Sequence, residues 1–328
     1  MDQQHAIVLL GHGGHDSEAN AAFFPLAERL TLRLGAAVTP AFLAAQPGLV
    51  ETARTLYDAG ARSFLVLPYF LRAGRHVLRD LPRLIGVCAD HLPDAVFETL
   101  PSLQDDPAVE DALLDRLIDR IGSGAPPHSA ADIEKRSYEI IAAALGRAAD
   151  GSAADAVARR VVHATGDLSF ARSLLVRPGA PEAGIAALSA GKNVFVDVRM
   201  LSAGITRVDA ARIGFGIADP DVVEKAKGEN STRAAAAVEK YADFWAGGII
   251  AVGNAPTAIW RLLELCGGGA RLPALVVGLP VGFVGAAEAK AALWDSGLPA
   301  ITNRGRRGGS PAAAAAVNAL ALLADMDR

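Results

Sequence analysis

The chain has 328 residues, a length that allows about two domains, and 51% of them are hydrophobic while only 5% are aromatic. The net charge of −4 argues against a nucleic-acid-binding surface and against a polybasic membrane surface. The N-terminus has no export signal, no apolar run reaches the length of a membrane span, and Cys88 and Cys266 lie outside any CxxC pattern, so we expect a cytoplasmic protein without nucleic-acid or membrane partners.

The first part of the chain alternates short apolar runs with amphipathic segments. These patterns predict strands at 6–10, 38–43, 63–69 and 96–100 and helices at 21–34, 49–59 and 107–121. Such an alternation is typical of a parallel sheet covered on both faces. The stretch 122–129, GSGAPPHS, is rich in Gly, Ser and Pro and predicts a linker.

The second part repeats this α/β pattern without any internal repeat. It predicts helices at 132–145, 155–163, 230–245 and 312–324 and buried parallel strands at 194–198, 249–252 and 274–279. We therefore expect an α/β protein of two three-layer α/β/α domains, each with a mainly parallel sheet. The expected division is a domain at 1–121, a linker at 122–131 and a second domain at 132–328.

Two loops of the first part carry histidines. His12 lies in Gly11-His12-Gly13-Gly14 directly after the first strand, and His76 lies in the loop after the third. Since ligands bind at the carboxyl ends of parallel strands, both loops should emerge at one edge of the sheet. Two neutral imidazoles facing each other would make a borderline site for divalent cobalt, nickel, iron or zinc. The alternative is an ordinary glycine-rich turn between a strand and a helix.

Residues 6–86 resemble the small sirohydrochlorin cobaltochelatase family. The resemblance lies in Leu10-Gly11-His12-Gly13, in EANAAF (18–23), in PAFL (40–43) and in PYFLRAGRHVLRDLP (68–82). It implies that His12 and His76 bind the metal, with Co²⁺ as the substrate metal, and take part in its exchange for pyrrole protons. Where the family usually has an acidic residue after the Ala-Phe-Leu strand, this chain has Ala44-Ala45-Gln46.

His163, in VVHATGD (161–167), is the only histidine after residue 128. Histidine as a residue type exchanges a proton near neutral pH without strong tuning. One interpretation is therefore a catalytic acid or base, and the other is a core histidine at a helix end.

Several other loops of the second part combine hydroxyl groups, arginines and helix starts. Hydroxyls, main-chain N–H groups and arginine forks suit a ligand with many carboxylates. The alternative is that each Ser or Thr is an N-cap and that the arginines between 304 and 307 lie in a solvated turn. The candidate ligand-binding residues are Arg136, Ser137, Thr206, Arg207, Thr232, Arg233, Asn254, Arg306 and Ser310.

Residues from about 132 to 324 resemble the precorrin-8X methylmutase family of cobalamin biosynthesis. The motifs, in order, are RSYEII (136–141), VVHATGD (161–167), DVRMLSAGITR (197–207), NSTRAAAA (230–237), GNAPTAIW (253–260), GLPVGFVGAAEAK (278–290) and RGRRGGSPAAAA (304–315). Relatives often have a histidine before the glycine of LSAG (201–204), where this chain has alanine, so we expect a single imidazole in the site.

The second resemblance implies an isomerase without a cofactor that moves a methyl group from C11 to C12 of a corrin precursor. His163 matches the family's catalytic histidine, which acts as the proton donor to a ring nitrogen. The candidate residues above would bind the acetates and propionates of the tetrapyrrole, with the better support for Arg136 and Arg306. The resemblance also implies a homodimer with the pocket near the subunit interface.

The role of the first domain stays open at the level of sequence. It either inserts cobalt, which makes the chain bifunctional, or it binds metal or tetrapyrrole without catalysis. His12 and His76 favour insertion, while Ala44 favours binding alone. A nucleotide-binding protein is disfavoured, because no GxGxxG motif has the right acidic partner and no Walker-type lysine is present. The associated chelatase-like domain indicates cobalt-precorrin-8 as a natural substrate beside precorrin-8X.

Overall fold

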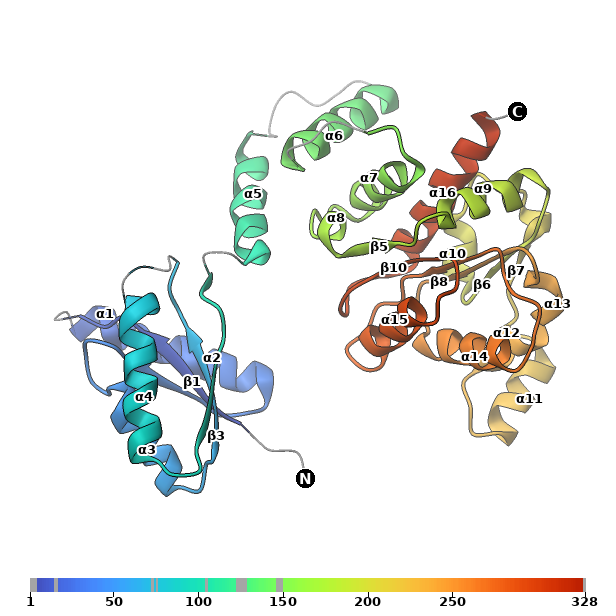
Figure 1. Cartoon of the computed structure of the whole chain (residues 1–328). Coiled ribbons are helices and arrows are strands. Elements are labelled where there is room, and N and C mark those ends of the chain that lie inside the picture. The colour runs from blue at the N-terminus through green and yellow to red at the C-terminus, as the bar shows by residue number, and fades with distance from the viewer. Residues whose placement is uncertain are drawn as a thin grey trace. The chain divides into compact units, whose positions relative to one another are not determined.

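The computed structural model describes residues 5–14, 17–71, 74, 76–103, 106–121, 129–145 and 150–326. The chain forms two compact units, residues 1–116 and 117–328, and the boundary falls within helix α5. Figure 1 shows both units, coloured along the chain. Each unit contains its own sheet, and the predicted α/β class is confirmed.

The N-terminal unit is built on a four-stranded parallel sheet. Its elements are β1 (Ala6–Gly11), α1 (Ser17–Ala21), α2 (Phe24–Leu34), β2 (Val38–Phe42), α3 (Leu49–Asp58), β3 (Ser63–Pro68), the π-helical turn His76–Asp80, α4 (Leu81–His91), β4 (Val96–Thr99) and α5 (Pro107–Ile121). The strand order is β2-β1-β3-β4, and every pair is parallel.

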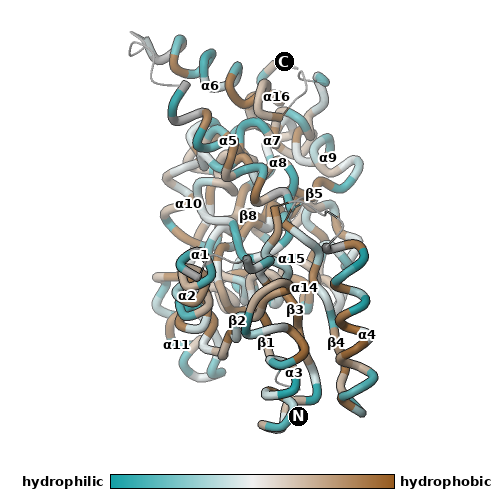
Figure 2. Tube along the Cα trace, turned by 90° about the vertical axis from the view of Figure 1, so that its left-hand side faces the viewer, coloured by the Kyte–Doolittle hydropathy of each residue, from teal (hydrophilic) through white to brown (hydrophobic). Residues whose placement is uncertain are grey.

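Alternation along β1 divides the core of this unit between the two faces of the sheet. Val8 and Leu10 belong to a cluster with buried residues of α3 and α4. Leu9 points the other way and packs with Ala27 of α2. Helix α4 shows hydrophobic and hydrophilic residues along its length in Figure 2, as expected of a helix with one apolar face. The sheet is therefore covered on both faces, which a parallel sheet requires.

The C-terminal unit has a six-stranded sheet of order β5-β10-β9-β8-β6-β7. Only the pairing of β5 with β10 is antiparallel among the described strands. Its elements are α6 (Ala130–Ala144), α7 (Ala153–Thr165), α8 (Phe170–Ser173), β5 (Leu174–Val176), α9 (Ala180–Ser189), β6 (Val194–Val196), α10 (Arg199–Gly204), the 3-10 turn Ala210–Arg212, β7 (Ile213–Gly214), α11 (Pro220–Gly228), α12 (Arg233–Lys240), α13 (Ala242–Trp245), β8 (Ile249–Val252), α14 (Pro256–Gly267), β9 (Leu275–Gly278), α15 (Ala286–Asp295), β10 (Ala300–Asn303) and α16 (Ser310–Met326).

Helices cover both faces of this second sheet. Helices α9 and α16 pack on one face, and α14 and α15 pack on the other (Figure 1). Helix α16 is buried along most of its length, because alanine methyls let α7, α9 and α10 approach it closely. No helix of the described residues is long and apolar enough to span a membrane.

Two predicted helices are each divided in the structure. The helix predicted at 21–34 is wrong as one element, because Pro25 lies in the first turn of α2, where its missing N–H costs nothing, and α1 ends before it. The helix predicted at 230–245 is wrong in the same way. It begins only at Arg233, after the N-cap Thr232, and it is interrupted at Tyr241 between α12 and α13.

Candidate active site

The site lies at the carboxyl edge of the C-terminal sheet, where four parallel strands end close together. The segments that follow β6, β8, β9 and β10 begin at Asp197, Gly253, Leu279 and Arg304. The main chains touch one another: Leu279 N–H donates to the carbonyl of Val252 at 2.8 Å, and Gly309 N–H donates to that of Leu279 at 2.8 Å. These loops therefore form one continuous rim, as expected for the ligand-binding edge of an open α/β sheet.

Asp197, directly after β6, organises the loop after β8. It is fully buried, and its carboxylate accepts from the N–H groups of Gly253, Asn254 and Ala255 at 3.1, 2.8 and 2.7 Å. Burial raises the pKa of this carboxyl, and the three main-chain donors oppose that rise. The sequence motif contained this residue, but the prediction did not single it out. A carboxylate directly after an apolar strand was the available signal.

His163 is held by two side chains of α6. It lies in the last turn of α7, which begins at the N-cap Ser152 and ends at Gly166 in the left-handed conformation. The hydroxyl of Ser137 lies 2.7 Å from Nδ1 of His163, and the ring of Tyr138 stacks on the imidazole with centroids 5.2 Å apart. Because Ser137 occupies Nδ1, Nε2 is the nitrogen that can act on a ligand.

His163 lines a hollow of about 480 Å³, named here the His163 hollow. Its wall is formed by Arg160, Ala164, Met200, Gly204, Ser310, Pro311, Ala314, Ala315 and Asn318. Of the residues predicted from sequence, His163 and Ser310 are therefore brought together, with Gly204 from the segment before Thr206. Methyl groups of α16 form much of this wall, and polar groups stand around it. A flat apolar macrocycle with polar substituents suits such a surface.

Arg160 and Asn318 also line the His163 hollow, and the sequence prediction missed both. Arg160 is one turn before His163 on α7, and its Nη1 donates to Glu134 at 2.6 Å and to the Tyr138 hydroxyl at 3.2 Å. Asn318 donates to the carbonyl of Gly204 at 2.8 Å. The only sequence signal for Asn318 was an amide within an alanine-rich buried helix.

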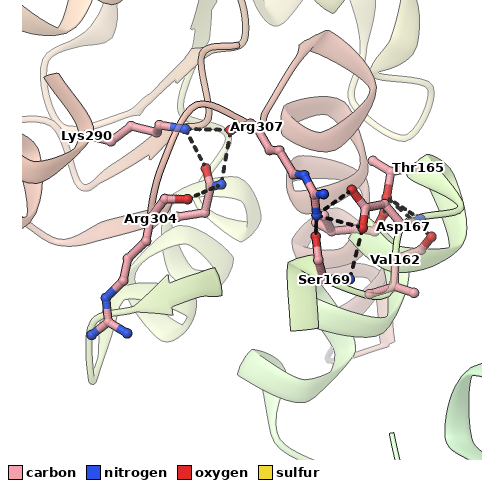
Figure 3. A network of polar contacts seen from close by, with 9 residues as sticks. Val162, Thr165, Asp167, Ser169, Lys290, Arg304 and Arg307 are labelled. Carbon is pink, nitrogen blue, oxygen red and sulfur yellow. Dashed lines mark hydrogen bonds and ion pairs between the residues drawn. The ribbon is translucent and has the colours of Figure 1, made fainter. Parts of the chain in front are cut away.

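A second hollow of about 350 Å³ shares Ala164 and Pro311 with the first and is named the Arg307 hollow. Arg307 lines it, whereas the prediction chose the neighbouring Arg306. The guanidinium of Arg307 reaches Asp167 at 3.3 Å and contacts the hydroxyl of Ser169 (Figure 3). Arg306 is exposed and lies over the ring of Phe283 instead, at 5.3 Å from the centroid.

The glycines around Arg306 have reasons within the main chain. A Cβ atom at Gly308 would lie 2.3 Å from the carbonyl oxygen of Leu279, so only glycine fits beside that loop. Gly309 has a φ of 128°, which other residues rarely adopt. The glycine-rich composition therefore reflects the close approach of two loops.

Arg136, Thr206 and Arg207 are not among the residues that line the two hollows. Arg136 is exposed and lies in the middle of α6, not at a helix start. Thr206 and Arg207 follow α10 and are exposed, and their N–H groups donate to Oδ1 of Asn318 at 2.9 and 3.2 Å.

Thr232, Arg233 and Asn254 lie at or beside helix starts. Thr232 is the N-cap of α12, and its hydroxyl is 2.7 Å from that of Thr257. Arg233 is the first residue of α12, and both it and Asn254 are exposed. The N-cap interpretation therefore accounts for Thr232.

In the N-terminal unit, His12 lies in an exposed loop after β1. Its Nδ1 is 2.6 Å from the carbonyl oxygen of Gly13 and donates to it, so the lone pair of the neutral ring is on Nε2, the atom that would ligate a metal. Ala44 N–H donates to the carbonyl of His12 at 2.8 Å. An acidic residue at position 44 would thus lie next to the His12 loop, and this chain has a methyl group there.

His76 is the partner predicted for His12. The side chain of His76 lies outside the described part of the structure, while its main chain begins the π-helical turn. Strands β1 and β3 are parallel neighbours, so the loops that contain the two histidines do leave the same edge of the sheet. Within the residues that the structure describes, no group of three or more His, Cys, Asp or Glu could hold a metal ion.

The fold and these positions agree with comparisons to known proteins. The model of the precorrin-8X methylmutase family matches residues 132–323, more than half of the chain. The chain belongs to the precorrin-8X methylmutase family. A second family model, CbiX, matches residues 6–120. The protein is thus a methylmutase of cobalamin biosynthesis with a chelatase-like N-terminal domain.

The matches to relatives of the methylmutase part cover nearly the whole length of those relatives. The cobalt-precorrin-8 methylmutase of Priestia megaterium is 43% identical over 197 residues, 59% of this chain and 88% of the relative. The precorrin-8X methylmutase of Pseudomonas aeruginosa is 44% identical over 194 residues, 58% of this chain and 93% of the relative. A solved methylmutase from Thermus thermophilus has a TM-score of 0.56 and 39% identity, and the match covers 60% of this chain and 98% of that one.

Proposed function

We propose that the methylmutase domain, residues 132–328, moves the C11 methyl group of precorrin-8X or cobalt-precorrin-8 to C12, giving hydrogenobyrinate or its cobalt form. The names of the relatives support both substrates. The observation that carries the proposal is the placement of His163 in the wall of the His163 hollow, which is partly lined by alanine methyl groups. Ser137 contacts Nδ1 of the imidazole, and the ring of Tyr138 stacks on its face.

His163 acts as the proton donor to the ring nitrogen beside the migrating methyl group. Protonation makes the conjugated system electron-poor, the C11–carbon bond breaks as the C12–carbon bond forms, and the proton then returns to His163. The reaction is an isomerisation with no net change in oxidation state and uses no cofactor. Positioned proton transfer of this kind contributes about 10²–10⁴-fold.

The substrate's acetates and propionates bind to the polar rim. Among the residues named from sequence, Ser310 lines the His163 hollow, and Arg306 lies on the loop beside the Arg307 hollow. Arg136, Thr206, Arg207, Thr232, Arg233 and Asn254 are proposed as outer contacts with these carboxylates. Ser137 we assign to His163 instead of the substrate, because its hydroxyl is already within 2.7 Å of the imidazole.

The test compares wild type with His163→Ala on metal-free and cobalt-loaded substrates, following the visible spectrum of product formation. We expect kcat to fall by about 10²–10⁴-fold in the variant, while product binding persists. Full activity in a well-folded His163→Ala protein would contradict the assignment. A rate difference between the two wild-type reactions identifies the natural substrate.

For the N-terminal domain, residues 1–121, we propose a divalent-metal site formed by His12 and His76, with residues 122–131 linking it to the methylmutase. Two functions fit this site: insertion of Co²⁺ into sirohydrochlorin, or binding of metal or tetrapyrrole without insertion. Ala44 beside His12 favours binding, because a methyl group cannot serve as the acidic ligand or base. Incubation with sirohydrochlorin and Co²⁺ distinguishes them by the appearance of the cobalt product's spectrum.

We also propose that the enzyme is a cytoplasmic homodimer. Both cysteines are free, which fits a reducing compartment. Phe283 and Val284, in the loop after β9, are each 89% exposed, and Val281 in the same loop lines the Arg307 hollow. Such exposed apolar side chains at the rim favour burial against a second copy. Light scattering would show twice the mass of the chain.

A further inference from the structure

Lys290 is a buried cation beneath the loop that joins β10 to α16. It lies on α15 and is 1% exposed. Its Nζ donates to Oδ1 of Asn303 at 3.0 Å and to the carbonyl oxygen of Arg307 at 2.5 Å (Figure 3). Neither acceptor carries a full negative charge, and no carboxylate pairs with Lys290 among the described residues. Such burial of a charge is costly to folding.

Asn303 holds the same loop from the end of β10. Its Nδ2 donates to the carbonyl of Arg304 at 3.2 Å and to that of Arg307 at 3.0 Å. The carbonyl of Arg307 therefore accepts from both Lys290 and Asn303. Two buried side chains, Lys290 and Asn303, therefore hold the main chain of Arg307 in place.

The other end of Arg307 is held from helix α7 and the turn after it. Its Nη1 contacts both carboxylate oxygens of Asp167 and the hydroxyl of Ser169. Asp167 follows the C-cap of the helix that carries His163, and Figure 3 shows the guanidinium pointing toward it. Both contacts are made by Nη1, and the described residues give Nη2 no acceptor, so that nitrogen still has hydrogens to donate.

We propose that Lys290 is a positioning residue of the methylmutase site, which fixes the main chain of Arg307 so that its guanidinium presents a carboxylate-binding group to the Arg307 hollow. Arg307 lines that hollow and is about half exposed, with 54% of its side-chain surface accessible. An arginine fork is suited to a carboxylate, and the substrate is a polycarboxylate. This inference rests on the proposed function.

A purely structural role does not explain the choice of lysine. An apolar side chain of similar length would fill the same volume without the cost of burying a charge. Burial lowers the pKa of Lys290 to about 8, which is the mark of that cost. What the lysine adds is a directed hydrogen bond to the carbonyl of Arg307, together with one to Asn303, which holds the same loop.

The test measures kcat, KM and product affinity in Lys290→Met, with Lys227→Met as the matched control. Lys227 is an exposed lysine in the last turn of α11. We expect Lys290→Met to raise KM and the Kd for hydrogenobyrinate by about tenfold, since one directed hydrogen bond is lost, and to leave kcat within about twofold. The control should match wild type. A folded Lys290→Met protein with wild-type KM would overturn the proposal.

Asn303→Ser provides a second route to the same loop if Lys290→Met does not fold. It removes Nδ2 and the two hydrogen bonds that this atom donates, and it is expected to raise KM in the same way. A wild-type KM would again overturn the proposal. Arg307→Gln supplies the link: Lys290→Met added to it should raise KM no further, and an additive increase would show that Lys290 does not act through Arg307.

His163→Ala, measured in the same series, separates the two hypotheses. Full activity there removes the proposed function. An inactive His163→Ala together with a wild-type KM in Lys290→Met removes only the role of Lys290.

Discussion

In the C-terminal unit the loops at the carboxyl edge rest on buried polar side chains, whereas in the N-terminal unit the described part of the His12 loop is held by main-chain bonds and by Asn20, whose side chain is not buried. Asp197, Lys290, Asn303 and Asn318 are each less than a tenth exposed and each bonds to a loop of the site. Among the described residues of the N-terminal unit, Thr52 is the one buried polar side chain.

This difference fits two kinds of ligand. A large organic substrate that must lie accurately against His163 gains from loops that are already in place, because ordering them at the moment of binding costs free energy. A metal ion forms strong bonds of its own to the ligands and can order them itself. Among the described residues, the same edge of the same kind of sheet is thus supported by buried polar side chains in one unit and by main-chain bonds and a partly exposed asparagine in the other.

The largest expected effect comes from removing the carboxylate of Asp197. Asp197→Ala leaves three main-chain N–H groups without their acceptor and should lower the free energy of unfolding by about 3 kcal/mol. All three tryptophans lie between residues 245 and 294, so tryptophan fluorescence during urea unfolding reports on the C-terminal unit alone. Asp221→Ala, which removes an exposed carboxylate, is the control and should change stability by less than about 0.5 kcal/mol. An equal loss of stability in Asp197→Ala and Asp221→Ala would show that the buried carboxylate does not support the loop after β8.

The buried charge of Lys290 predicts a dependence of stability on pH. The pKa is about 8 in the folded protein and about 10.4 when unfolded. Between these values the unfolded chain binds more protons, so stability rises with pH and is lost again as pH falls toward 8. Relative to Lys290→Met, the wild type should gain up to about 3 kcal/mol over this window. A difference that stays constant from pH 8 to 10.5 would contradict the burial of a charge there.

Ser137 should affect the rate more than the affinity. Ser137→Ala removes the hydroxyl that holds Nδ1 of His163, and we expect kcat to fall about tenfold, corresponding to about 1.4 kcal/mol in orientation of the proton donor. KM should stay near wild type. Ser137→Thr keeps a hydroxyl and should restore most of the rate. A rise in KM with an unchanged kcat would return Ser137 to the substrate-binding residues.

The smallest effect is expected in the N-terminal unit. With free Co²⁺ equal to its Kd, a single site stabilises the folded state by only about 0.4 kcal/mol. His12→Ala/His76→Ala should abolish this shift, measured by calorimetry or thermal unfolding, while His91→Ala, a histidine bonded to Val87 within α4, should retain it. The same cobalt affinity in the double variant would place the metal elsewhere.

Sequence alone predicts the features that depend on neighbours along the chain. The α/β class and most strands followed from periodicity, and the ordered motifs identified His163 and the family. The sequence did not predict which groups meet across the fold. Asp197 acts on a loop 56 residues later, and Lys290 acts on one 17 residues later. The local sequence pattern does not indicate which residues form such contacts.

The positions of adjacent residues within one motif also depend on contacts across the fold. Arg306 and Arg307 are adjacent in a motif, and only the position of Asp167, 140 residues earlier, decides which of them faces the hollow. Arg136 and Ser137 are also adjacent, and the position of His163 on the facing helix decides which of them contacts the imidazole. A helix or a loop presents neighbouring residues in different directions, and that direction is a property of the packing.

The alanine side chains of α16 both line the His163 hollow and pack against the neighbouring elements. Ala314 and Ala315 form part of the wall of the His163 hollow, while α16 packs against both α7 and the sheet. A Cβ atom on Gly204 would come within 2.9 Å of the Ala314 methyl. Helices α10 and α16 are therefore too close at this point for a side chain at position 204. A change of side-chain size along α16 would therefore alter both the shape of the His163 hollow and the packing against α7, the helix that bears His163.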